Sequence, residues 1–168
     1  VVLSGKPEDL ALTDQTAMDC IDKDRRFQDY DNYLWIKHAG ENNLVIGTQA
    51  RILYQDGETR KKIALAFNRL VREGKTGPIM MGRDHMDTGG VDAPSRETSN
   101  IHDGSNITAD MSALVYGGDA AMGMTMMTMH NGGGTGIGNS QSCGYGLLLD
   151  GSPEVDEIIC RAVNYDVM

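Results

Sequence analysis

The sequence predicts an α/β fold in which helices lie on the faces of a layered sheet. Hydrophobic residues at helical spacing alternate along the chain with short apolar runs of strand length. This alternation is typical of layered α/β architecture. Two dense polar segments follow predicted strands, and sheets of this kind bind ligands at strand ends. The 168 residues suffice for one domain with a buried core, and the apolar content of 40% is that of a globular protein.

The N-terminal part of this single domain is polar and mixed, and two helical patterns stand out in it. They cover Leu10–Ile21 and Tyr30–Ala39. The single tryptophan, Trp35, is expected to anchor this part by burying its large ring. We therefore predict a helical or irregular lead-in over residues 1–43, followed by the α/β portion over residues 44–168.

The α/β portion contains alternating strands and helices. Branched, aromatic and other apolar residues predict strands at Leu44–Tyr54, Pro78–Gly82, Met124–Met129 and Tyr145–Leu149. Apolar residues at a spacing of 3.6 predict helices at Thr59–Glu73, Thr108–Ala121 and Pro153–Val163. Gly74 is expected to end the first of these helices, because glycine readily takes the left-handed conformation found there.

The segment Met81–Asp103 concentrates ionisable residues of both signs, and its glycines and proline break any regular helix. Such charges on an irregular loop suit substrate positioning and proton transfer. The candidate catalytic residues of this segment are Arg83, Asp84, His85, Asp87, Arg96 and Glu97. The alternative interpretation is a solvated surface loop whose charges pair with one another.

Two of the histidines are candidates for proton transfer. His85 and His130 each follow an apolar run and border a polar segment, and an imidazole titrates near neutral pH. We interpret His38 and His102 as surface or structural residues.

The glycine run HNGGGTGIGNSQ, residues 130–141, has two interpretations. Closely spaced glycines let backbone N–H groups approach an anion, as in phosphate-binding loops. However, the run has no strict G-x-G-x-x-G, and the chain has no G-x-x-x-x-G-K-[ST]. A tightly packed turn therefore explains it equally well.

Charge and cysteine content exclude several classes of partner. A net charge of −9 argues against nucleic acid and anionic membranes. No apolar run reaches the length of a membrane span, and the first residues do not resemble a signal peptide. Three separated cysteines favour free thiols in a reducing, cytoplasmic compartment and no zinc site. Cys160 is expected in the core and Cys143 near a functional site.

Several long motifs resemble the urocanate hydratase (urocanase) family of histidine degradation. They are GRDHMD, PSRETSNIHDGS, HNGGGTGIG and GYGLLLDG, in that order. The segment IGTQARILYQDGETR resembles the animal-type branch in particular. The resemblance covers nearly the whole chain, from VVLSGKPEDLALTDQTAM onward. It implies the C-terminal portion of the core domain of a longer enzyme, with the NAD-binding domain absent from this chain.

The resemblance implies an enzyme with a small-molecule substrate. Members of this family add water to urocanate to give imidazolonepropionate, and the resemblance also implies a homodimer for the full-length enzyme. Tightly bound NAD⁺ acts there as an electrophile that withdraws electrons from the substrate, and the protein supplies orientation and proton transfer.

The family motifs can be carried over by position. Residues Arg83, Asp84, His85 and Asp87 match GRDHxD, and Arg96 and Glu97 match RET. The H-x-GGG motif, which resembles a glycine contact to NAD, is matched by His130, Gly132, Gly133 and Gly134. The chain departs from many bacterial members at Leu53, where they carry cysteine, and at Asn131, where they carry a second histidine.

Two other functions are compatible with the residues. A chain without an NAD-binding domain lacks most of a cofactor pocket, so it could be a non-catalytic binding or assembly module that keeps the fold. A metal-dependent hydrolase could use Asp84, His85, Asp87 and His130 as ligands. The chain lacks H-E-x-x-H or another fixed ligand spacing, and a chelator would inactivate such a hydrolase but not a urocanase.

Overall fold

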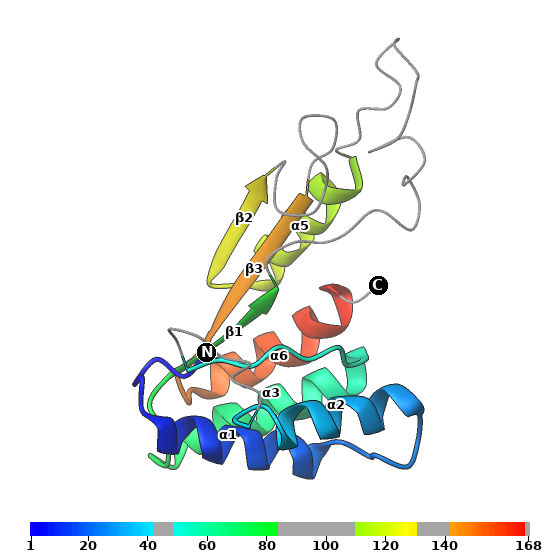
Figure 1. Cartoon of the computed structure of the whole chain (residues 1–168). Coiled ribbons are helices and arrows are strands. Elements are labelled where there is room, and N and C mark those ends of the chain that lie inside the picture. The colour runs from blue at the N-terminus through cyan, green and yellow to red at the C-terminus, as the bar shows by residue number, and fades with distance from the viewer. Residues whose placement is uncertain (42–48, 84–109, 131–141, 167–168) are drawn as a thin grey trace. The chain divides into compact units, whose positions relative to one another are not determined.

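The computed structural model describes residues 1–41, 49–83, 110–130 and 142–166 (Figure 1). The helices are α1 (Pro7–Cys20), α2 (Phe27–Lys37), α3 (Gly57–Arg72), α5 (Asp110–Met122) and α6 (Pro153–Asp166). The strands are β1 (Ile79–Arg83), β2 (Met126–His130) and β3 (Ser142–Leu149). The predicted α/β class is confirmed, and each of these elements overlaps one predicted from the sequence.

The chain divides into two compact units. Unit 1 consists of Val1–Met81 and Leu148–Met168, and unit 2 consists of Gly82–Leu147. The predicted boundary between residues 43 and 44 falls outside the described residues, so that division of the chain stays a prediction.

Helix–helix packing builds unit 1. Helix α3 packs against α6 and α1, and α1 packs against α2. The core shared by α1, α2 and α3 is aliphatic and is formed by Ala17, Cys20, Ile21, Ile36 and Ile63. On α6, the buried residues are those of one helical face, Val155, Ile159, Ala162 and Val163. Burial of these faces is the main source of stability for helices of this length.

Both ends of α3 are capped, and the stop at Gly74 was predicted from the sequence. The side chain of Asp56 accepts a hydrogen bond from the Thr59 N–H at 2.8 Å, which satisfies a free donor of the first turn. At the other end, Gly74 has φ of +66°, its N–H bonds to Val71 O, and the Lys75 N–H bonds to Leu70 O. This pair of bonds is a Schellman motif, and it confirms Gly74 as the helix stop.

The strand predicted at Leu44–Tyr54 is wrong for its described part, residues 49–54, which is irregular. Asn32 donates to Tyr54 O at 2.9 Å and accepts from Tyr54 N at 2.9 Å, and Gln49 O accepts a bond from the Val2 N–H at 2.9 Å. Ile52 and Tyr54 are 67% and 71% exposed. Branched and aromatic residues favour a strand when neighbouring structure buries one face of it, but these two side chains are mostly exposed.

Two further burial predictions are wrong. Trp35 is 49% exposed because its neighbour Ile36 takes the inward position on α2. Cys160 is exposed because Ile159 takes that position on α6. Adjacent helical residues differ in direction by about 100°, so a shift of one residue in the inward position exchanges a buried side chain for an exposed one.

Candidate functional site

The end of β2 and the start of β3 meet at one edge of the sheet. The strand order is β1-β3-β2, and β2 pairs antiparallel with β3 so that His130 lies opposite Ser142. In Figure 1 the arrows of β1 and β2 run the same way, and β1 ends part-way along β3. His130 and Ser142 therefore form this edge, which we call the site edge, whereas Arg83 ends β1 further along β3, where Gly82 lies against Tyr145 and Gly146. All three residues belong to unit 2.

The glycine that precedes Arg83 sets how closely the end of β1 approaches β3. A Cβ on Gly82 would lie 2.2 Å from the carbonyl oxygen of Tyr145 and 3.1 Å from the Gly146 Cα. Real Cβ contacts are essentially never that short, so only glycine lets β1 approach β3 this closely. The strand predicted at Pro78–Gly82 is thereby confirmed, and it leads directly into Arg83 as expected.

The candidate residues are only partly described. Arg83 is the last residue of β1 and is half-buried. His130 is placed by its backbone at the end of β2. With β3 between them and strands about 4.8 Å apart, the backbones of Arg83 and His130 are at least about 10 Å apart, and Arg83 is also displaced along β3 relative to His130. The other candidates lie outside the described residues, namely Asp84, His85, Asp87, Arg96, Glu97, Gly132, Gly133 and Gly134.

Cys143 lies next to the site edge. It is fully buried in β3, where its register partner on β2 is Met129. Its burial keeps its thiol away from solvent, and its proximity to a functional site stays a prediction. In the parts of the chain that the structure describes, no group of three or more His, Cys, Asp or Glu residues could hold a metal ion. None of the described helices is long and apolar enough to cross a membrane.

The family relationship is decided by comparison with known proteins. Residues 1–168, the whole chain, match the family described as the urocanase C-terminal domain. The chain belongs to this family. It is 48% identical to the "Probable urocanate hydratase" of Caenorhabditis elegans, 46% to that of Dictyostelium discoideum and 43% to the "Urocanate hydratase" of Mus musculus. These relatives confirm the family resemblance seen in the motifs.

The alignments cover the chain and its relatives very unequally. Each covers 99% of this chain but 26% of the relative. The chain thus spans about a quarter of the length of the curated relatives it matches.

One urocanase motif of this chain, GYGLLLDG, has a structural role in unit 1 at its last glycine. Gly151 has φ of +88°, and its N–H donates to Asn68 Oδ1 at 2.8 Å. The Asn68 amide donates in turn to Ser152 O at 2.9 Å and to Asp156 Oδ1 at 2.7 Å. Arg72 Nε bonds to Gly151 O at 2.7 Å. These bonds fix the turn from β3 to α6 on the side of α3.

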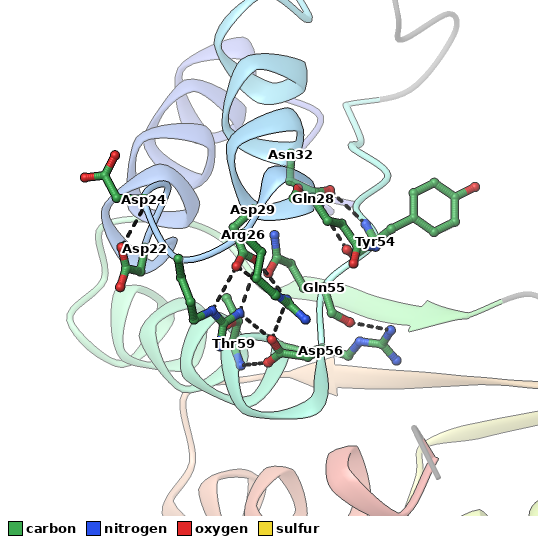
Figure 2. Close-up of polar contacts among 12 residues, drawn as sticks. Asp22, Asp24, Arg26, Gln28, Asp29, Asn32, Tyr54, Gln55, Asp56 and Thr59 are labelled. Carbon is green, nitrogen blue, oxygen red and sulfur yellow. Dashed lines mark hydrogen bonds and ion pairs between the residues drawn. The ribbon is translucent and has the colours of Figure 1, made fainter.

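Sequence reasoning missed an ionic cluster in unit 1, which we call the arginine–aspartate cluster (Figure 2). Its members are Arg25, Arg26, Asp29 and Asp56. Both guanidinium groups bind the Asp29 carboxylate in a bidentate manner, at 2.8 and 3.1 Å from Arg25 and at 2.9 Å twice from Arg26. Arg26 also reaches Asp56 at 2.6 Å, and Arg25 contacts the same carboxylate.

This cluster is balanced in charge and joins α2 to the start of α3. The guanidinium groups of Arg26 and Arg25 hold the pKa of the Asp29 carboxyl well below its usual range. The spacing from Arg25 and Arg26 to Asp29 is visible in the sequence, since residues three and four apart meet on a helix. The contact with Asp56 joins distant parts of the chain and has no local signal. Two cations on two carboxylates leave no excess charge for a ligand, so we interpret the cluster as structural.

Replacing Asp29 by Asn is expected to lower the free energy of unfolding by about 2 kcal/mol at pH 7. The Asp29 side chain is 1% exposed, but its partners are 40% and 42% exposed, so the loss is below that of a fully buried pair. Denaturant unfolding of the full-length protein measures the loss. Because the folded pKa is lowered, the Asp29 contribution is complete above the unfolded pKa of about 3.9 and disappears as the pH falls below it.

The matched control is Glu73→Gln, which removes a carboxylate from an exposed pair with Lys75. We expect little or no change in the free energy of unfolding for it, because solvent screens an exposed pair. Equal losses in the two variants, or an Asp29→Asn loss that is unchanged at pH 3, would contradict the structural role of the cluster.

Proposed function

We propose that this chain is the C-terminal part of a urocanate hydratase, a hydro-lyase that adds water to urocanate to give imidazolonepropionate. The observation that carries the proposal is the family match over residues 1–168. The arrangement of unit 2 supports it, since the two segments that bear the family motifs are both attached to strand ends of one sheet. The segment 84–109 follows Arg83, and the segment 131–141 joins His130 to Ser142.

The proposed chemistry assigns proton transfer to Asp84 and His85. Both follow directly on β1, and a strand end holds the backbone beside them more rigidly than a loop tip would. A carboxylate next to an imidazole can remove one proton and supply another near neutral pH, as the addition of water requires. Asp87, Glu97 and His130 are further candidates for this role. Arg83 and Arg96 carry guanidinium groups that match the carboxylate of the substrate.

NAD⁺ is the proposed cofactor, and when bound it supplies the electron-accepting ring of the reaction. We assign its contact in this chain to Gly132, Gly133 and Gly134. Because His130 and Ser142 are register partners, both ends of the glycine run are held at the site edge. Closely spaced glycine N–H groups suit the anionic part of such a cofactor. A cytoplasmic location, a homodimer and a role in histidine degradation belong to the same proposal.

The full-length protein is expected to consume urocanate without net formation of NADH. Loss of the conjugated ultraviolet absorbance of urocanate measures the reaction, and absorbance at the NADH band provides the redox control. Treatment with a chelator should leave the rate unchanged, which separates the proposal from a metal-dependent hydrolase. A purified full-length protein that carries NAD and leaves urocanate intact would contradict the proposed function.

The isolated chain of 168 residues is expected to bind NAD weakly or not at all. It contributes one glycine run and no adenosine site under this proposal, so little of the ligand could be buried. Titration calorimetry of the isolated chain, with the full-length protein as the positive control, measures the difference. Micromolar affinity of the isolated chain would show that its cofactor site is far more complete than proposed.

A further inference from the structure

The glycine of β1 lies against the backbone of β3. A Cβ on Gly82 would meet the Tyr145 carbonyl oxygen at 2.2 Å, the Gly146 Cα at 3.1 Å and the Tyr145 carbonyl carbon at 3.2 Å. All three are backbone atoms, so none of them can rotate away as the end of a flexible side chain could. A side chain at position 82 must therefore push the two strands apart.

Strand β3 is held in place, so the end of β1 has to take up such a displacement. β3 is the middle strand of the sheet, and on its other side it pairs with β2. Its residues Cys143, Tyr145 and Leu147 are only 0%, 4% and 1% exposed. A shift of the end of β1 by about 1 Å would restore ordinary contact with the Tyr145 oxygen.

This contact joins two of the urocanase motifs. Gly82 is the first residue of GRDHMD, and Tyr145 and Gly146 belong to GYGLLLDG. Because β1 runs in the direction of β2, it runs antiparallel to β3 (Figure 1). Asp84 and His85 follow Gly82 by two and three positions. The contact therefore sets the place on the sheet from which the chain continues to these two residues.

We propose that Gly82 is a positioning residue of the reaction, because its missing side chain sets where the chain leaves β1 toward Asp84 and His85. The inference rests on the proposed function, which assigns proton transfer to these two residues. Gly82 carries no group that could react, so it acts only through the residues that follow it. A catalytic group displaced by about 1 Å can cost about 100-fold in rate.

Gly82→Ala in the full-length protein is expected to lower kcat for urocanate by about 100-fold. The rate is measured at saturating urocanate, because saturation removes any effect of a displaced Arg83 on substrate binding. Bound NAD should be retained, since the proposal places most of its contacts outside this chain. NAD content and melting temperature are measured on the same preparation, and kcat is calculated per NAD-loaded molecule well below the melting temperature.

Two matched alanine variants separate position from stability. Gly151→Ala also places a Cβ against backbone, 2.7 Å from Arg72 N, but it lies in unit 1, beyond the other end of β3. It should lose stability while its kcat stays within about 3-fold of the wild type. Gly117→Ala lies in unit 2, where its Cβ would meet no heavy atom within 4 Å, and it should lower neither quantity.

A glycine inserted between Arg83 and Asp84 provides a second variant without a steric conflict at Gly82. It lengthens the backbone by about 3.4 Å and leaves the contact of Gly82 with β3 intact, so it tests the inference even if Gly82→Ala does not fold. Because it displaces Asp84 and His85 relative to that contact, it is expected to lower kcat by about 100-fold or more.

Two results would overturn the inference. One is a kcat within about 3-fold of the wild type in Gly82→Ala or in the insertion variant. The other is an equal loss of kcat in Gly82→Ala and Gly151→Ala, because stability alone would then explain it. A wild-type protein that leaves urocanate intact contradicts the proposed function itself. An active wild type together with an active Gly82→Ala contradicts only the role of Gly82, so the two failures are distinguishable.

Discussion

Asp84→Asn in the full-length protein is expected to lower turnover of urocanate by about 100-fold or more, while bound NAD is retained. A positioned acid or base typically contributes this much to a rate. Asparagine keeps the shape of the side chain but can neither accept nor release the proton. The cofactor stays bound because the proposal places most of its contacts outside this chain. Turnover, NAD content and melting temperature are measured on one preparation.

The matched control for this variant is Asp92→Asn, in the same charged segment but outside the matched motif GRDHxD. It should leave turnover within about 3-fold of the wild type. If Asp84 only pairs with Arg83 or Arg96, Asp84→Asn will lose stability and cofactor together with rate. If the variant melts normally, keeps its NAD and turns over like the wild type, Asp84 has no part in the mechanism.

The sequence predicts correctly the elements whose structure is set by the spacing of their apolar residues. Helix α3 was predicted within two residues at each end, because its apolar face and the stop at Gly74 agree. The end of β1 was predicted for a similar reason, since an apolar run there meets a charged segment. The strand predicted around Ile52 is wrong because a strand needs a neighbouring strand to pair with, and only the tertiary fold decides whether one is present.

The candidate site, like the fold, could be predicted from the sequence only in part. Position along the chain predicted that Arg83 and His130 follow strands, and β1 and β2 end at these residues. The strand order that places β1 and β2 on the two sides of β3 has no local signal. The contact of Arg26 with Asp56 also has no local signal, because the two residues are distant in sequence. Roles for the motif residues came from the family resemblance, because charge and spacing alone did not exclude a solvated surface loop.

Gly151→Ala is expected to lower the free energy of unfolding by about 3–4 kcal/mol. Two independent costs add up at this position. Its φ of +88° is unfavourable for any residue with a Cβ, at about 1–2 kcal/mol. The added Cβ would also lie 2.7 Å from Arg72 N and 2.9 Å from Arg72 Cα. These are backbone atoms of α3 that cannot rotate away, so overpacking adds about 1–3 kcal/mol. Denaturant unfolding of the full-length protein measures the total.

The chain provides a matched control for separating the two costs. Gly74 also has a left-handed φ, +66°, but a Cβ there would meet no heavy atom within 4 Å. Gly74→Ala should therefore lose only the conformational cost, about 1–2 kcal/mol. The difference between the two variants isolates the contact of Gly151 with α3. Equal losses would mean that the turn from β3 to α6 shifts to make room for the added Cβ at little cost. The motif glycine would then be required only for its backbone conformation.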